Sequence, residues 1–387
     1  MKCLIIHPRL VVGGAERVIL LTANGLSRLG IDVHLAFNEI SNSDMTRYRR
    51  ELISESNILL IHSNETKNSN GLMSRIRCYV NDFKGLTSFL IKNSDNYDVI
   101  IPHNFPSYWS AALIGKTIPV VWTCHEVLGF YGDLRDFFES KKSLHILINV
   151  LYGLDRFIVK NRISKIITNS KMNVSLLVGR YGVSSYLAYP PVDIDLFCEK
   201  RRKRMMDCDL VLLHVGRLVK LKNHIASLIA LTMVKREIPN SKLIIIGDGP
   251  WKGRLLHAAK ALGSEKDVIL LETLNDYELA KIYSASDICL HPVLEQSFGI
   301  TPFEAVVSGT PTVVSNKCGA AEIFMEYAPE MLADPEPRKI ANKILEMYHN
   351  YDEFMDRVRR FRDVVFSKLS PRNYSETILR IIKEEVV

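Results

Sequence analysis

HPVLEQSFGITPFEAVVSGTPTVVS, residues 291–315, contains a strand end, a glycine-bearing loop, a short helix and a second strand. Thr301-Pro302-Phe303-Glu304 predicts the helix start, because threonine caps, proline fits the first helical position, and a glutamate three residues after the cap reaches back. Gly309 is expected to end the helix. A helix between two such strands is typical of an α/β fold.

The loop before this helix has features of a site for an anion and a sugar. At Phe298-Gly299 the backbone can approach a ligand without a side chain in the way, and free N–H groups at a helix start favour an anion. Glu295 and Glu304 flank the turn, and Gln296 stands beside the first. These residues predict a site for a phosphorylated, hydroxyl-rich molecule.

Apolar strand runs alternate with helical stretches along the whole chain. VVGGAER, residues 11–17, joins a strand run to a helix as in a βαβ unit, and the pattern begins again after residue 210. The expected strands are Lys2–His7, Ile31–Phe37, Asp98–His103, Pro119–Glu126, Lys165–Ser170, Ser185–Pro191, Leu210–Arg217, Lys242–Pro250, Asp267–Glu272, Asp287–Pro292 and Thr310–Ser315. The sequence therefore predicts two tandem, doubly wound, Rossmann-like α/β domains.

A chain of 387 residues is too long for one ordinary core, so two domains are expected. We place the first domain at residues 1–190, a linker with prolines and a basic run at 191–209, and the second domain at 210–369. Residues 370–387 are expected to form a helix that packs back on the first domain. Doubly wound sheets bind ligands beyond the carboxyl ends of their strands, which predicts a cleft between the domains.

The composition is that of a globular protein, with 47% hydrophobic and 24% charged residues. The seven cysteines are odd in number and form no CxxC pair, which favours reduced thiols in the cytoplasm and no zinc framework. The histidines show no metal-ligand spacing, so no metal is expected. The apolar run at the start is too short for a signal peptide, and no run is long enough to span a membrane.

The net charge of +7 lies in the first half of the chain. Residues 1–190 hold 22 Lys and Arg against 15 Asp and Glu, whereas residues 191–387 hold 28 of each. Residues 67–86 and 134–165 stand out for their basic and apolar side chains, which fits peripheral attachment to an anionic membrane surface on the cytosolic side. An amphipathic helix that covers the sheet explains the same pattern. No aromatic–basic strand pattern supports nucleic-acid binding.

Further candidates stand where expected strands end. Backbone amides at Gly13-Gly14 suit a phosphate, although a tight turn alone explains the glycines. Arg217 and Lys222 follow the first strand of the second domain, where two cations suit a diphosphate, although an exposed basic loop is the alternative. Gly249 lies in another tight turn, GDGP.

His125 and Glu126 end the expected strand PVVWTCHE. A histidine in such an apolar setting is more often a hydrogen-bonded structural residue than a catalyst.

The chain resembles the large retaining glycosyltransferase family with the GT-B fold, the family 4 or group 1 type. The resemblance runs nearly end to end through GGAER, CHE, VGRLVKLKN, IIIGDGP and EQSFGITPFEAVVSGTPTVVS, in that order. It implies transfer of a hexose, mannose or similar, from a GDP- or UDP-linked sugar to a lipid-linked or saccharide acceptor. It also implies that the reaction retains anomeric configuration and needs no metal or other cofactor.

The resemblance implies a role for each matching residue. Gly14 would approach the donor phosphate or the sugar, and His125 would contact the transferred sugar. Arg217 and Lys222 would bind the diphosphate, and Glu304 would hold the ribose hydroxyls. Backbone amides for the sugar and phosphate would come from Phe298, Gly299 and Ile300. The acceptor would meet the first domain.

One position departs from the family pattern, which places two glutamates eight positions apart. Eight positions before Glu304 stands Gln296, so either the loop shifts to let Glu295 serve, or Gln296 acts as a neutral partner. The departure leaves open a non-catalytic partner subunit that keeps the fold and binds a nucleotide sugar. A glycoside hydrolase that uses Glu295 and Glu304 is disfavoured, because one of these carboxylates starts a helix beside phosphate-binding groups.

Overall fold

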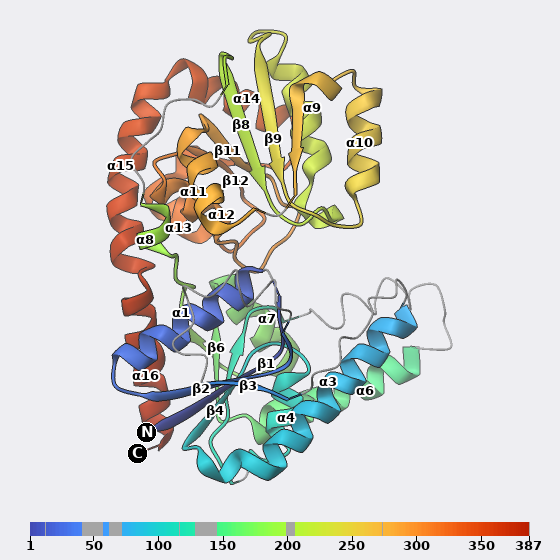
Figure 1. Cartoon of the computed structure of the whole chain (residues 1–387), viewed down its shortest axis with the longest axis vertical. Coiled ribbons are helices and arrows are strands. Elements are labelled where there is room, and N and C mark those ends of the chain that lie inside the picture. The colour runs from blue at the N-terminus through green and yellow to red at the C-terminus, as the bar shows by residue number, and fades with distance from the viewer. Residues whose placement is uncertain are drawn as a thin grey trace. The chain divides into compact units, whose positions relative to one another are not determined.

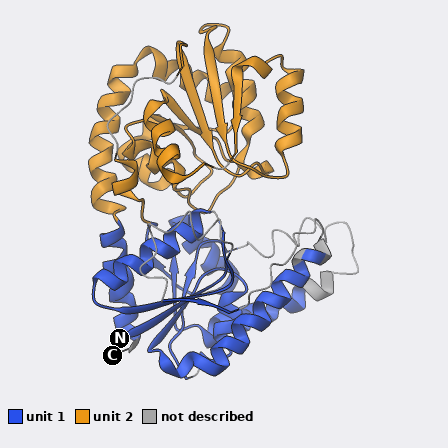
Figure 2. Cartoon of the chain, in the orientation of Figure 1, with its two compact units in different colours: residues 1–190, 371–387 blue, residues 191–370 orange. Residues whose placement is uncertain are grey.

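The computed structural model describes residues 1–11, 13–40, 57–61, 72–115, 117–127, 145–198, 206–272 and 274–386. The chain divides into two compact units (Figure 2). The first comprises residues 1–190 and 371–387, and the second comprises residues 191–370. Each unit is a parallel α/β fold, so the predicted pair of Rossmann-like domains is confirmed.

The first unit is built on parallel strands with helices on both faces (Figure 1). The strand order is β3-β2-β1-β4, and the bridges Ile100↔Val120 and His103↔Thr123 continue it into β5-β6-β7. The strands are β1 (Lys2–Leu10), β2 (Asp32–Ile40), β3 (Ile58–Leu60), β4 (Val99–Pro102), β5 (Val121–Cys124), β6 (Lys165–Thr168) and β7 (Tyr186–Leu187). The helices are α1 (Gly14–Arg28), α3 (Leu72–Asn93), α4 (Ser107–Ala112), α6 (His145–Arg162), α7 (Lys171–Tyr181) and α16 (Pro371–Val386).

Strand β1 separates two apolar cores, because successive side chains of a strand point to opposite faces. Ile5 lies in one core with residues of α1 and α16, and Leu4 lies in the other with residues of α3 and α4. Ile378 and Ile381 of α16 are fully buried in the first of these cores. The last helix of the chain is thus part of the first unit.

The second unit contains the sheet β10-β9-β8-β11-β12-β13, again with all pairs parallel. Its strands are β8 (Leu210–Val215), β9 (Ser241–Ile246), β10 (Val268–Leu271), β11 (Ile288–His291), β12 (Thr312–Ser315) and β13 (Leu332–Ala333). Its helices are α8 (Ile194–Phe197), α9 (His224–Val234), α10 (Lys252–Ala261), α11 (Asp276–Ala285), α12 (Thr301–Val307), α13 (Ala321–Tyr327), α14 (Pro337–His349) and α15 (Tyr351–Lys368). Every strand run expected from the sequence overlaps an observed strand, whereas the short strands β3 and β13 were not expected.

The expected linker at residues 191–209 differs from the structure. Val192, Leu196 and Phe197 are buried, and the Val192 N–H donates to the carbonyl of Leu369 at 2.9 Å. Residues 191–198 therefore belong to the second unit, because the apolar side chains between the prolines and the basic run are buried in it. The basic run itself, residues 199–205, lies outside the described residues.

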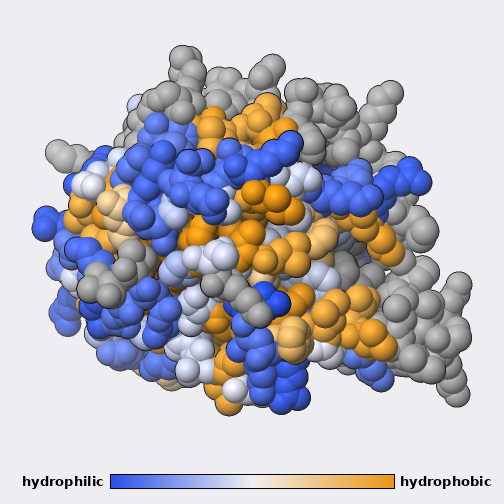
Figure 3. All heavy atoms as spheres, turned by 90° about the horizontal axis from the view of Figure 1, so that it is seen from below, coloured by the Kyte–Doolittle hydropathy of each residue, from blue (hydrophilic) through white to orange (hydrophobic). Residues whose placement is uncertain are grey.

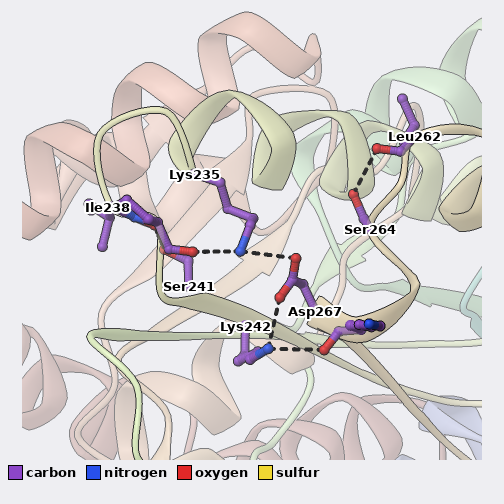
Figure 4. Close-up of polar contacts among 9 residues, drawn as sticks. Lys235, Ile238, Ser241, Lys242, Leu262, Ser264 and Asp267 are labelled. Atoms are coloured by element: carbon purple, nitrogen blue, oxygen red, sulfur yellow. Dashed lines mark hydrogen bonds and ion pairs between the residues drawn. The ribbon is translucent and has the colours of Figure 1, made fainter.

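An ion-pair cluster joins α9 to the edge of the second sheet (Figure 4). Asp267 accepts from Lys235 Nζ at 2.9 Å and from Lys242 Nζ at 2.7 Å. Desolvation pushes the pKa of Asp267 upward, but the bonds from Lys242 and Lys235 lower it overall. This carboxylate therefore stays charged and ties three segments that lie apart in the sequence.

Gly309 ends helix α12 as predicted. Its φ of +80° is a conformation that suits glycine, and its N–H donates to the Val306 carbonyl at 3.0 Å. The next strand, β12, begins three residues later.

Candidate active site

The strand order of the second unit reverses between β8 and β11. From β8 the chain proceeds outward through β9 and β10, then returns to the other side of β8 for β11, β12 and β13. In open parallel sheets, ligands bind beyond the carboxyl ends of the strands at such a point. Arg217 and Lys222 follow β8, and Gln296 follows β11, so the predicted residues collect there.

Lys222 and Gln296 form a direct contact across this point. The Lys222 ammonium donates to Gln296 Oε1 at 2.8 Å. The backbone of Gln296 is bridged to Cys318, and its carbonyl accepts from the N–H of Gly319 at 3.1 Å. Gln296 is half-buried, whereas Glu295 is exposed. The structure therefore brings Gln296, and not Glu295, to Lys222.

Asn223 ties the two loops together, and sequence analysis missed it. Its φ of +58° is left-handed, a region in which asparagine is enriched. Its side-chain amide donates to the carbonyls of Pro292 at 3.0 Å and Pro335 at 2.9 Å. The asparagine that closes the VGRLVKLKN motif was visible in the sequence, but its two partners lie 69 and 112 positions away.

The loop from Phe298 to Ile300 is shaped by close packing. Gly299 has a φ of +101°, and a Cβ at this position would lie 2.8 Å from Nε2 of His291. Phe298 is buried and stacks on Phe303 with 5.4 Å between ring centroids. Ile300 directly precedes α12. Only glycine fits at position 299, because a side chain there would collide with the buried His291.

The turn at Gly249 packs against the loop after β8. A Cβ on Gly249 would lie 2.6 Å from the carbonyl oxygen of Leu218. The Leu218 N–H donates to the Asp248 carbonyl at 2.8 Å, and the Leu218 carbonyl accepts from the N–H of Trp251 at 2.9 Å. These bonds fix the backbone next to Arg217, whose side chain is exposed.

The predicted capping box at Thr301 and Glu304 is wrong. Helix α12 begins at Thr301 itself, after Ile300, whose φ of −83° and ψ of −26° are already helical, and no side chain caps it. Glu304 therefore stands one position too far along to reach back. Its carboxylate instead accepts a hydrogen bond from the Tyr283 hydroxyl at 2.9 Å, and both residues are buried.

Three histidines lie buried near Lys222. The rings of His214 and His224 stack with 3.9 Å between centroids, and His291 ends β11. Burial lowers the pKa of all three, that of His224 to about 4, and the charge of Lys222 lowers each further. These imidazoles are neutral at pH 7, so they add no charge beside Lys222.

In the first unit, helix α1 begins at Gly14, directly after Gly13. Gly13 has extended backbone, and a Cβ there would lie 2.3 Å from Oε2 of Glu16. Glu16 is itself buried. A carboxylate of the chain thus lies against the glycine turn at the helix start, where the sequence predicted a phosphate.

His125, directly after β5, is held by three side chains that sequence analysis missed. Its Nε2 lies 2.7 Å from Nδ1 of His103. Its carbonyl accepts from Nδ2 of Asn169 at 2.9 Å and from Nδ2 of Asn173 at 3.3 Å. Burial lowers the pKa of His125 to about 3, so the ring is neutral. The partners lie 22 to 48 positions away, and only strand pairing brings them together.

Within the described parts of the chain, no group of three or more His, Cys, Asp or Glu residues is arranged to hold a metal ion.

Two protein families match adjoining parts of this chain. Glycosyltransferase Family 4 matches residues 12–196, and Glycosyl transferases group 1 matches residues 199–362. An uncharacterised glycosyltransferase of Methanocaldococcus jannaschii is 28% identical over 307 residues, which is 75% of this chain and 76% of that protein. A GDP-mannose-dependent alpha-(1-6)-phosphatidylinositol dimannoside mannosyltransferase of Mycobacterium tuberculosis is 26% identical over 195 residues, 49% of this chain and 50% of that protein.

The fold also matches solved structures. HepE of Anabaena, crystallised with UDP and glucose, superposes with a TM-score of 0.74 at 17% identity, over 99% of this chain and 100% of that one. The fold is that of GT-B glycosyltransferases. The chain belongs to the family 4, group 1 type of glycosyltransferases.

Proposed function

We propose that this glycosyltransferase moves a hexose, mannose or similar, from a UDP- or GDP-linked donor to a lipid-linked or saccharide acceptor. Retention of anomeric configuration and independence of metal are parts of the proposal. The observation that carries it is the Lys222–Gln296 pair at the strand ends of the second unit. The UDP and glucose bound to HepE and the GDP-mannose in the name of the mycobacterial relative support the donor class.

The chemistry assigned to this site is stabilisation of a departing diphosphate. The leaving group of a nucleotide sugar is a diphosphate, which develops negative charge as its bond to the sugar breaks. A preorganised cation stabilises this negative charge and so lowers the barrier. Lys222 contacts the neutral amide of Gln296, so this partner adds no counter-charge beside the ammonium. Hydrogen bonds that involve a charged group contribute about 1.5–3 kcal/mol each. Arg217, exposed in the same loop, is the second proposed cation.

Three further residues are given proposed roles in binding the donor. Glu304, fixed by Tyr283, is proposed to hold the ribose hydroxyls, because a carboxylate accepts from two neighbouring hydroxyls. Gln296 is proposed to contact a hydroxyl of the sugar. A neutral amide can fill this role, whereas it could not act as a nucleophile. His125 is proposed to contact the transferred sugar from the first unit.

A product screen tests this function. Purified protein is mixed with UDP- and GDP-sugars, polyprenyl phosphates and simple saccharides, with and without a metal chelator, and products are identified by mass and anomeric configuration. The proposal expects an α-linked product from an α-linked donor, in equal yield with chelator. Nucleotide binding without any transfer would instead indicate a non-catalytic partner subunit. No affinity for either nucleotide would exclude both.

The proposed membrane contact concerns helix α6. Val150, Leu154 and Phe157 are exposed and lie four and three positions apart, on one helix face, with Arg156 and Lys160 exposed beside them. Figure 3 shows one end of the molecule, with apolar and hydrophilic residues side by side on its surface. No helix in the described ranges is both long and apolar enough to cross a membrane. An exposed apolar stripe with basic neighbours suits the surface of an anionic bilayer.

The buried side of α6 explains why this stripe faces outward. Asp155 is fully buried and accepts hydrogen bonds from the hydroxyls of Tyr108 and Tyr181, each at 2.7 Å. These bonds fix the rotation of the helix. Lys141, Lys142 and the aromatic residues at 137 and 138, which belong to the same predicted surface, lie outside the described residues.

Co-sedimentation with vesicles tests the membrane contact. The pair Leu154→Ser and Phe157→Ser should reduce binding to anionic vesicles at low salt at least about fivefold, because it removes most of the apolar stripe. Leu256→Ser, at an exposed leucine of α10, is the matched control and should bind like the wild type. A wild-type protein that ignores anionic vesicles at low salt contradicts the proposal.

A further inference from the structure

Three imidazoles gather where the strand order of the first unit reverses, between β1 and β4. His7 lies in β1, His103 directly follows β4, and His125 directly follows β5. Pairing of Ile6 with Pro102 and the bridge between His103 and Thr123 set the three strand ends side by side. The sequence motifs single out only the third of these histidines.

His103 and His125 share a single hydrogen. Nδ1 of His103 lies 2.7 Å from Nε2 of His125, and the ring centroids are 5.0 Å apart. Burial lowers the pKa of both rings, and the nearby ionisable rings of His125 and His7 lower the pKa of His103 further. Both rings are thus neutral, and each neutral imidazole has one N–H and one bare nitrogen. One ring must donate and the other must accept.

The surroundings of His103 decide which ring donates. Its exposed fraction is 0%, and its Nε2 has no hydrogen-bond partner among the described residues. A hydrogen on that Nε2 would be a buried donor without an acceptor, which is among the rarest arrangements in folded proteins. The hydrogen of His103 therefore belongs on Nδ1, where it points at His125. His125 accepts with Nε2, so its own hydrogen is on Nδ1.

The backbone of His125 is fixed as well. Its carbonyl accepts from Asn169 and Asn173, and Asn173 Nδ2 also donates to Asn169 Oδ1 at 2.7 Å. Asn173 is fully buried, and its N–H donates to Ser170 Oγ, the cap of α7. The ring and the carbonyl of His125 are thus both restrained by buried groups from neighbouring strand ends and from α7, while the residue itself stays partly exposed.

We propose that His103 is a positioning residue that holds His125 as the neutral Nδ1–H tautomer, so that His125 offers a hydrogen-bond donor to its ligand. This donor would meet a hydroxyl oxygen of the transferred sugar, a detail that rests on the proposed function. In this role His125 neither removes nor delivers a proton. The tautomer itself is a property of the free protein and is independent of any substrate.

The tautomer is measured directly by nitrogen-15 NMR of the full chain labelled at histidine, with His125 assigned from the signal lost in His125→Asn. We expect a ring with a protonated Nδ1 and a bare Nε2, unchanged between pH 8 and pH 5.5. A protonated Nε2, or a ring that titrates near pH 6.5, overturns the proposal. This result does not depend on whether the protein transfers sugar.

Kinetics of His103 variants supply the second test. His103→Asn keeps an N–H donor near the position of Nδ1, whereas His103→Leu removes it. We expect His103→Leu to lower kcat at least about tenfold with an unchanged KM for the nucleotide sugar, and His103→Asn to recover most of kcat. His34→Ala is the control, because His34 bonds to Tyr97 in another part of the unit.

The outcomes separate the positioning role of His103 from the proposed function of the protein. Equal kcat in the wild type and in a folded His103→Leu overturns the positioning role. If His103→Leu does not fold, His103→Asn and the tautomer of the wild type decide. If the wild type transfers no sugar, the proposed function fails, and the NMR result alone decides the state of His125.

Discussion

At the residue scale, the candidate site places neutral side chains beside the ammonium group of Lys222. Lys222 contacts the amide of Gln296, and burial keeps the nearby His214, His224 and His291 uncharged. A carboxylate at position 296, where the family pattern places a glutamate, would lie within ion-pair distance of Lys222. The amide leaves the positive charge without a counter-charge from this residue, which suits an anionic ligand.

Tyr283 tests the arrangement around Glu304. Tyr283→Phe removes the hydroxyl that donates to the buried carboxylate, and loss of such a partner costs about 1–3 kcal/mol. We expect Tyr283→Phe to bind UDP or GDP roughly tenfold more weakly than the wild type. For analogues that lack the ribose hydroxyls, we expect the variant and the wild type to bind with nearly equal affinity. Calorimetry measures both. Tyr277→Phe, at an exposed tyrosine of the same helix, is the control. Equal losses for ribose and dideoxyribose ligands would contradict the role given to Glu304.

Local sequence rules did not predict the contacts of a side chain whose partner lies far away in the sequence. Thr301 and Glu304 have the spacing of a capping box, yet Tyr283 takes the carboxylate from 21 positions away. Counting positions left Glu295 and Gln296 as equal candidates, and only the bridge to Cys318 orients the loop. His103 gave no signal in the sequence, because its contact with His125 follows from the pairing of strand ends.

At the element scale, helix α16 completes a core whose other members lie far away in the sequence. Its residues Ile378, Ile381 and Ile382 are buried against α1 and the first sheet. The amphipathic pattern of residues 372–385 predicted such a buried face, because burial of an apolar stripe is what stabilises an isolated terminal helix. We expected this helix to pack back on the first domain, and it lies in the first unit; the pattern could not identify α1 as its partner.

Gly25 in α1 tests the contact between α1 and α16. A Cβ at Gly25 would lie 1.9 Å from Oγ and 2.6 Å from Cβ of Ser375, which is fully buried. Gly25→Ala should therefore destabilise the fold by about 1–3 kcal/mol through overpacking, despite the better helix propensity of alanine. Urea denaturation measures the change. Addition of Ser375→Gly should restore part of the loss, and a Gly25→Ala protein as stable as the wild type would contradict this packing.

At the scale of the whole molecule, each unit places histidines at the reversal of its strand order. His7, His103 and His125 occupy this position in the first unit, and His214 and His291 occupy it in the second. The alternation of strands and helices predicted both sheets, since apolar runs of this length form buried parallel strands. The histidines could not be grouped from the sequence, because strand order is a property of the folded unit.

These buried histidines predict acid sensitivity. Burial lowers the pKa of His7 and of His224 to about 4, from an unfolded value near 6.5. Between these values the unfolded chain binds protons that the folded chain does not, so stability is complete above pH 6.5 and falls as the pH falls toward 4. At pH 5 each of these two histidines should lower the free energy of unfolding by about 2 kcal/mol.

Urea denaturation at pH 7.5 and pH 5 checks this sign and magnitude. We expect the free energy of unfolding to be several kcal/mol lower at pH 5, and His224→Gln to reduce the difference. A protein that is equally stable at both values, or more stable at pH 5, would contradict the neutral state assigned to these rings.

The central claim is that Lys222 holds the diphosphate of a nucleotide sugar at the strand ends of the second unit, and titration of UDP and GDP by calorimetry tests it most directly. Lys222→Ala should bind the preferred nucleotide roughly tenfold to a hundredfold more weakly, the loss expected for one charge-assisted hydrogen bond. Lys220→Ala, at an exposed lysine of the same turn, should bind like the wild type. Wild-type affinity in a folded Lys222→Ala protein would contradict the account.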